Sequence, residues 1–286
     1  MSGTGAIGIF DSGIGGLSVA QAIRQLMPAE HLIYVADTAH APYGDKTDDF
    51  IFQRMDIITR YLLQSGVKAV VVACNTATTA AISKLRSAYP LPIIGVEPGI
   101  KPAVLVSKAK VVGVLATPRT LMTPAFASLT QRYADSATVL LQPCPAFVPL
   151  IESLQFDSQR MREAIQSYIQ PLLTQGADTL VLGCTHYNFI ADVIAEVAGP
   201  DVSIIRTENA VAKQLLRRLE LAGAVNTAPK ITETTLCTSG DIALFRRQLV
   251  RLWPQPGVKV TTLVSQLCAV CRKKKRRITP PFLCLF

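Results

Sequence analysis

Two stretches of the sequence decide the fold: Gly66-Val-Lys-Ala-Val-Val-Val-Ala-Cys74-Asn-Thr76 and Gly176-Ala-Asp-Thr-Leu-Val-Leu-Gly-Cys184-Thr-His186. They align without a gap at an offset of 110 residues, and Pro90 and Pro200 keep the same offset. In each stretch an apolar run of strand length ends at a cysteine and polar residues, which is typical of a buried strand that leads into a helix. This internal repeat predicts two similar lobes, each with a cysteine at the carboxyl end of the equivalent strand.

The rest of the chain alternates in the same way. Ala6–Phe10 reads as a strand, followed by the glycine-rich turn Asp11-Ser-Gly-Ile-Gly-Gly16 and a helix over Leu17–Met27. The pattern starts again with a strand at Lys110–Ala116 and a helix over Leu121–Tyr133. Alternating strands and helices predict an α/β fold with parallel sheets. We therefore expect two similar parallel-sheet lobes related by a pseudo-twofold axis, with the functional site in the cleft between them.

The composition favours a globular protein of about two domains. The chain has 286 residues, of which 49% are hydrophobic and 17% charged. No apolar run reaches the roughly 18 residues that a membrane-spanning helix needs. The first residues lack the positively charged region of a signal peptide. These features predict a cytoplasmic protein without a membrane partner.

The net charge of +9 comes mostly from one block, Arg272-Lys-Lys-Lys-Arg-Arg277. Without that block, 23 Lys and Arg residues face 20 Asp and Glu residues, so the remainder is nearly neutral. A nucleic-acid-binding function would therefore depend on that block alone. Nucleic acid is therefore not expected as a primary partner, and residues 265–286 are expected to form an atypical basic tail.

Seven cysteines occur, an odd number in a long chain with no export signal, so a disulfide scaffold is not expected. Cys268 and Cys271 are spaced like zinc ligands, but they have no second pair and no suitably placed histidine. We therefore expect no metal site. The remaining alternatives for a buried cysteine are apolar packing or a reactive thiol.

Cys74-Asn75-Thr76 and Cys184-Thr185-His186 provide the strongest functional signal. Ligands of α/β proteins bind at the carboxyl ends of the strands, where both tripeptides fall. If the lobes face each other, one thiolate can remove a proton from a carbon while the opposite thiol protonates the other face, which inverts the configuration. Asp11 and His186 are placed to tune the two thiols. The alternative is that both cysteines are small apolar residues that end buried strands.

The turn Asp11-Ser-Gly-Ile-Gly-Gly16 leaves three interpretations open. Its backbone amides could hold an anion at a helix start. It could belong to a dinucleotide site, with Asp37 as the ribose ligand, although Ser18 stands where a third glycine is required. It could also be a plain tight turn.

In combination, several segments resemble the glutamate racemases of the cofactor-independent aspartate/glutamate racemase superfamily. The match spans most of residues 5 to 263 and rests on Gly8-Ile-Phe-Asp-Ser-Gly-Ile-Gly-Gly-Leu17, Asp37 through Pro42-Tyr-Gly44, Val71-Val-Ala-Cys-Asn-Thr-Ala-Thr78, Ala116-Thr-Pro-Arg-Thr120, Pro149-Leu-Ile-Glu152 and Leu182-Gly-Cys-Thr-His-Tyr187. The resemblance implies an amino-acid racemase that interconverts L- and D-glutamate without pyridoxal phosphate or metal and supplies D-glutamate for peptidoglycan synthesis and cell-wall biogenesis. A racemase of another acidic amino acid, such as aspartate, is the alternative.

The resemblance also implies roles for individual residues. Cys74 would exchange the proton with D-glutamate and Cys184 with L-glutamate; Asp11 would support Cys74, and His186 would support Cys184 with Glu152 nearby. The residues that match the substrate site are Asp11, Ser12, Pro42, Tyr43, Gly44, Asn75, Thr76, Thr117, Thr120, Thr185 and His186. The implied organisation is a first lobe of residues 1–97 and 211–264, with the second lobe, 98–210, inserted between them. The resemblance leaves a monomer or a homodimer open and does not extend to the tail at 265–286.

Overall fold

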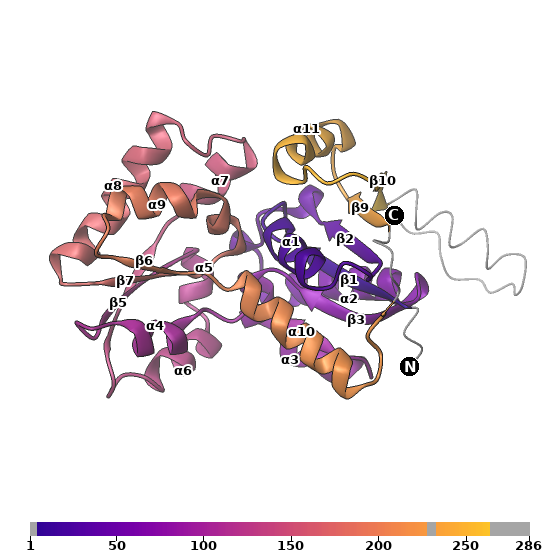
Figure 1. Cartoon of the computed structure of the whole chain (residues 1–286), viewed down its shortest axis with the longest axis horizontal. Coiled ribbons are helices and arrows are strands. Elements are labelled where there is room, and N and C mark those ends of the chain that lie inside the picture. The colour runs from indigo at the N-terminus through magenta and orange to yellow at the C-terminus, as the bar shows by residue number, and fades with distance from the viewer. Residues whose placement is uncertain (1–4, 228–232, 264–286) are drawn as a thin grey trace, which may run out of the picture.

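Two parallel sheets, one in each lobe, form the framework of the molecule (Figure 1). The computed structural model describes residues 5–227 and 233–263. The basic tail and three of the seven cysteines, Cys268, Cys271 and Cys284, lie outside the described residues. Within the described part, no helix is both long and apolar enough to cross a membrane.

The first sheet has six parallel strands in the order β10-β9-β2-β1-β3-β4. The two strands near the end of the described chain extend this sheet at the β2 edge, so distant parts of the sequence build one lobe. The strands are β1 (Ala6–Asp11), β2 (Leu32–Ala36), β3 (Val67–Val72), β4 (Ile93–Gly95), β9 (Thr234–Thr238) and β10 (Val258–Thr262).

The second sheet has four parallel strands in the order β6-β5-β7-β8. This order repeats the arrangement β2-β1-β3-β4 of the first sheet, and β4 and β8 lie 110 residues apart, as the repeat predicts. The predicted α/β fold with two parallel-sheet lobes is confirmed. The strands are β5 (Val111–Ala116), β6 (Thr138–Pro143), β7 (Thr179–Leu182) and β8 (Ser203–Ile205).

Helices on both faces cover the first sheet, as a parallel sheet requires. Thr47 accepts a hydrogen bond from the amide of Phe50 and so caps the start of α2. Helix α10 crosses back from the second lobe and packs against α1 (Figure 1). The elements are α1 (Leu17–Leu26), α2 (Asp48–Gln64), α3 (Asn75–Ala88), α10 (Glu208–Leu221) and α11 (Ile242–Leu252), with short 3₁₀ helices η1 (Thr38–His40) and η2 (Tyr43–Asp45).

One helix prediction in the second lobe is wrong. The segment expected to be a single helix, Leu121–Tyr133, is divided between two short helices. Thr123 accepts from the amide of Phe126 and starts a new helix, and Pro124 at its first position has no amide to continue the earlier one. The elements are α4 (Ile100–Val106), α5 (Pro118–Leu121), α6 (Pro124–Gln131), α7 (Phe147–Glu152), α8 (Gln159–Thr174), η3 (Thr185–Ile190) and α9 (Ala191–Ala198).

A continuous apolar core joins the two lobes. One cluster of buried side chains includes Leu17 on α1 of the first lobe and both Phe147 and Tyr187 of the second. Beside it, Ser18 donates to the carbonyl of Thr185 at 3.2 Å. Because this shared core is buried, it holds the carboxyl ends of the two sheets toward each other. The domain boundaries at 97/98 and 210/211 stay predictions.

Candidate active site

A cleft of about 670 Å³ lies between the lobes and is lined by both repeat cysteines. Cys74 follows β3 and Cys184 follows β7, so equivalent strands present the two thiols to one space. Their exposed fractions are 5% and 7%, which keeps bulk water away while leaving each thiol open to the cleft. Other predicted site residues that line it are Ser12, Pro42, Tyr43, Gly44, Thr76, Thr117, Glu152, Thr185 and His186.

Three predicted residues do not line this cleft: Asp11, Asn75 and Thr120. All are buried behind it. The side-chain amide of Asn75 donates to the carbonyl of Val96 at 3.1 Å, and its carbonyl oxygen has no hydrogen-bond partner within the described chain. Thr120 shares hydroxyl contacts with Thr76 at 3.2 Å and with Thr117 at 2.9 Å. These residues support the wall of the cleft rather than form its surface.

Cys74 is held as a neutral thiol. It caps α3, with the amide of Ala77 at 3.5 Å from its Sγ, and the Ser12 hydroxyl lies 3.6 Å from the same atom. Burial and then the charge on Asp11 raise the pKa of the Cys74 thiol well above its usual range, and the contacts with Ala77 and Ser12 only partly oppose them. Cys74 therefore carries a proton that it can donate.

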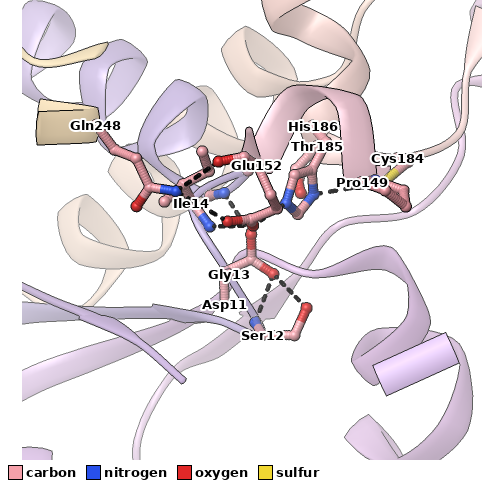
Figure 2. A network of polar contacts seen from close by, with 12 residues as sticks. Asp11, Ser12, Gly13, Ile14, Pro149, Glu152, Cys184, Thr185, His186 and Gln248 are labelled. Atoms are coloured by element: carbon pink, nitrogen blue, oxygen red, sulfur yellow. Dashed lines mark hydrogen bonds and ion pairs between the residues drawn. The ribbon is translucent and has the colours of Figure 1, made fainter. Parts of the chain in front are cut away.

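Cys184 lies at one end of a polar chain that also contains His186 and Glu152. Its Sγ is 3.7 Å from Nδ1 of His186, whose Nε2 is 2.7 Å from Oε1 of Glu152. Figure 2 shows His186 between the other two side chains, beside the turn of Asp11 and Ser12. Because both ring nitrogens have polar partners, the imidazole is oriented as a link between thiol and carboxylate.

The electrostatics of this chain favour an imidazolium at His186. Burial alone lowers the pKa of His186, but the contacts with Cys184 and Glu152 outweigh it and place this pKa well above the usual histidine range. For Glu152, burial raises the pKa, while His186, the Ile14 amide and Gln248 bring it below its usual value. The carboxylate and the imidazolium therefore form a partly buried ion pair next to Cys184.

The glycine-rich turn holds the protein's own carboxylates. The amides of Ser12 and Gly16 donate to Asp11, and the amide of Ile14 donates to Glu152 at 3.0 Å. Burial raises the pKa of Asp11 above its usual value. Three of the amides that could have held an external anion, those of Ser12, Ile14 and Gly16, are thus engaged by Asp11 and Glu152.

Two glycines of the turn are required by close approach. A Cβ at position 13 would lie 2.1 Å from Oε1 of Glu152, and one at position 15 would lie 2.2 Å from Nδ1 of His186. Real Cβ atoms essentially never approach other atoms this closely. The turn is therefore the surface of the first lobe on which the His186–Glu152 pair of the second lobe rests.

Asp37, considered above as a ribose ligand, is fully engaged inside the first lobe. Arg54 donates to both of its carboxylate oxygens at 2.9 and 3.0 Å, and the Tyr43 hydroxyl donates at 2.7 Å. His40 Nδ1 lies 3.0 Å from Oδ1. These contacts fix the backbone of the cleft-lining segment at Pro42 and Tyr43, and they contradict the dinucleotide interpretation.

Threonine hydroxyls connect the two lobes beside the cleft. Thr76 of the first lobe lies 3.2 Å from the hydroxyls of both Thr117 and Thr120 of the second. A hydroxyl can both donate and accept, so the group can rearrange its hydrogen bonds around a ligand. The sequence motifs marked all three residues, but only the structure shows that they meet.

Gln248, Cys144 and Arg119 are among the cleft residues that were not predicted from the sequence. Gln248 of α11 donates to the carbonyl of Glu152 at 2.8 Å and to its carboxylate at 3.3 Å, and it is buried. No sequence motif marks it. Cys144 lines the cleft without any local motif that marks it. Arg119 also lines the cleft; it stands inside the segment Ala116-Thr-Pro-Arg-Thr120, but no role was predicted for it. In the described part of the chain Cys74, Cys144, Cys184 and Cys237 are free thiols, and no three His, Cys, Asp or Glu side chains converge as a metal site requires.

Comparisons with known proteins agree with this arrangement. The family model for Asp/Glu/hydantoin racemases matches residues 7–215. A glutamate racemase of Methylococcus capsulatus is 49% identical over 248 residues, which cover 87% of this chain and 92% of that protein. The crystal structure of a Bacillus anthracis glutamate racemase has a TM-score of 0.82 at 30% identity and covers 91% of this chain and 97% of that one.

A Francisella tularensis glutamate racemase, solved in complex with D-glutamate, has a TM-score of 0.79 at 29% identity and covers 92% of this chain and 99% of that one. The similarity therefore extends over both lobes and the cleft between them. The chain belongs to the Asp/Glu/hydantoin racemase family.

Proposed function

We propose that this protein interconverts L- and D-glutamate by proton transfer at Cα, with Cys74 and Cys184 as the two acid–base groups. The observation that carries the proposal is that both thiols open into one cleft from the ends of equivalent strands of two facing lobes. The relatives reported above, which are glutamate racemases, support glutamate as the substrate.

In the direction from L- to D-glutamate, the Cys184 thiolate removes the Cα proton. Nδ1 of His186 lies 3.7 Å from Sγ and positions this group beside the cleft. The Cys74 thiol then donates its proton to the opposite face of Cα, which leaves the inverted product and a Cys74 thiolate. The reverse reaction begins at that thiolate, so no net proton is gained or lost. The assignment of each thiol to one enantiomer follows the family resemblance.

Proton transfer alone does not account for the rate. A positioned acid or base contributes about 10²–10⁴-fold, which is modest against the weak acidity of an amino-acid Cα proton. The developing carbanion must therefore be stabilised by nearby donors. Thr76, Thr117 and Thr185 line the cleft and are the candidates for contact with substrate, together with Ser12 and the segment Pro42-Tyr43-Gly44. Asp11, Asn75 and Thr120 would hold these residues from behind.

The direct test is circular dichroism of pure L-glutamate incubated with the purified protein, without any added cofactor. The ellipticity should decay to zero, and in ²H₂O deuterium should appear at Cα of both enantiomers. Comparing kcat/KM for glutamate and aspartate tests the alternative substrate. A protein that leaves L-glutamate optically unchanged, or that requires pyridoxal phosphate, would contradict the proposal.

The ion pair next to Cys184 leads to a prediction about pH. Glu152→Gln removes the carboxylate that raises the pKa of His186. The imidazolium is then lost at a lower pH than in the wild type. We expect the alkaline limb of kcat/KM for L-glutamate to move toward lower pH by about one unit or more. The side-chain amide of this variant can still accept a hydrogen bond from the Ile14 amide, so an unshifted limb would show that Glu152 does not act through His186.

The cellular role follows from the proposed reaction. D-glutamate made in the cytoplasm would supply peptidoglycan synthesis, as the family resemblance implies. A monomer and a homodimer are both compatible with a cleft that is lined by residues from both lobes of one chain. Light scattering at working concentrations, with and without D-glutamate, distinguishes the two states.

A further inference from the structure

An ion pair crosses from one lobe to the other at the cleft. Arg119 lies in α5 of the second lobe, two residues after Thr117, and its side chain lines the cleft. Its guanidinium donates to the carboxylate of Asp48, the first residue of α2 in the first lobe. No part of the proposed proton transfer uses this pair.

Arg119 also lines a second, more open hollow of about 530 Å³. That hollow contains Asp48 and Lys84, and it shares Gly44, Asp45 and Arg119 with the cleft. The shared residues place Arg119 at the passage between the outer hollow and the catalytic space. The side chains of Arg119 and Asp48 are 30% and 48% exposed, so water and ions reach the pair and can exchange with either partner.

The cleft is short of positive charge for an acidic substrate. Among the described residues that line it, the basic side chains are Arg119 and His186, and His186 is already held between Glu152 and Cys184. Glutamate carries two carboxylates and one ammonium group. The Nε atom of Arg119 is buried and has no hydrogen-bond partner in the described chain, so it can donate to a carboxylate once the side chain moves away from Asp48. Guanidinium groups bind carboxylates through two parallel hydrogen bonds.

We propose that Arg119 receives a carboxylate of the incoming acidic amino acid at the mouth of the cleft, and that Asp48 is the internal competitor that substrate displaces. This inference rests on the proposed function, because it requires an anionic substrate in the cleft. Arg119 is thus a substrate-binding residue whose availability Asp48 controls. The pair sets the apparent affinity for substrate and leaves the proton transfer at Cα unaltered.

The two partners predict opposite effects on KM. Replacing Arg119 with Met removes the charge-assisted hydrogen bond and should raise KM for both enantiomers by about tenfold or more, with kcat within about threefold. Arg119→Lys should fall between wild type and Arg119→Met. Asp48→Asn releases Arg119 from its competitor and should lower KM or leave it unchanged. Lys84→Met is the matched control. Lys84 lines the outer hollow but not the cleft, and it pairs with Asp49. The KM of this variant should stay within about twofold of the wild-type value.

Ionic strength provides a second measurement. Salt screens attraction between substrate and an accessible cation, so kcat/KM of the wild type should fall as salt rises, and Arg119→Met should flatten that dependence. If Arg119→Met and Asp48→Asn raise KM by similar factors, the ion pair serves only to hold the two lobes together, and the inference is overturned. An unchanged KM in Arg119→Met overturns it as well. Absence of glutamate racemisation by the wild type would instead refute the proposed function, so the two failures are distinguishable.

Discussion

Replacing Cys184 with Ser is expected to lower kcat for glutamate racemisation by about 10²–10⁴-fold in both directions, and Cys74→Ser should do the same. A serine hydroxyl is a far weaker acid than a thiol, so it neither forms the basic anion nor delivers a proton at a comparable rate. Racemisation slows in both directions because each direction requires an acid–base group on each face of Cα. Circular dichroism measured from pure L- and from pure D-glutamate checks this result.

Hydrogen exchange distinguishes a two-thiol mechanism from a single base. Cys184→Ser retains the thiol assigned to D-glutamate, so it should still exchange the Cα hydrogen of D-glutamate with ²H₂O without inversion. Cys74→Ser should show the same behaviour with L-glutamate. Cys237→Ser is the control, because Cys237 is a buried free thiol on β9 that does not line the cleft. If one variant racemises at the wild-type rate, the two-thiol assignment is wrong.

Gly15→Ala is the second substitution that we expect to lower kcat strongly, although it adds only one methyl group. That methyl would lie 2.2 Å from Nδ1 of His186, the atom that faces Cys184. His186 is 4% exposed and enclosed by its partners, so it cannot move aside without disturbing Glu152 or Cys184. Misplacement of a catalytic group by about 1 Å costs about 10²-fold, and we expect a fall in kcat of that order or more for L-glutamate.

A double-mutant cycle tests whether Gly15→Ala acts through His186. In a His186→Asn background the Cys184–His186 contact is already lost, so adding Gly15→Ala should lower kcat little further. Thermal unfolding of each variant shows whether the lobes remain folded. Independent, additive losses in the cycle would mean that the methyl group acts on the turn itself rather than on His186.

The local pattern of apolar and polar residues was sufficient to predict most of the strands and helices. The apolar runs that end at Cys74 and Cys184 are short and regular, and both form strands at equivalent positions of their sheets. The single helix expected over Leu121–Tyr133 was wrong because Thr123 and Pro124 start a new helix inside it. Helical periodicity is judged over several residues. A single capping residue such as Thr123, or the missing amide of Pro124, is therefore easily overlooked.

The site was predictable where residues stand next to one another in the chain. Cys184 and His186 are two positions apart, and their contact could be anticipated. Glu152 is 138 residues from Ile14 and 96 from Gln248, yet it contacts both. The ion pair between Asp48 and Arg119 spans 71 residues. No periodic or local signal encodes contacts at such separations.

The order of hydrophobic and polar residues alone determined the repeated strand units and placed a thiol at the end of each, because strand and helix formation follow from local periodicity. The way the two units face each other was decided only by the tertiary structure. Packing of the shared core brings the turn with Gly13 and Gly15 against His186 and Glu152, and it is this packing that turns two separate thiols into one site.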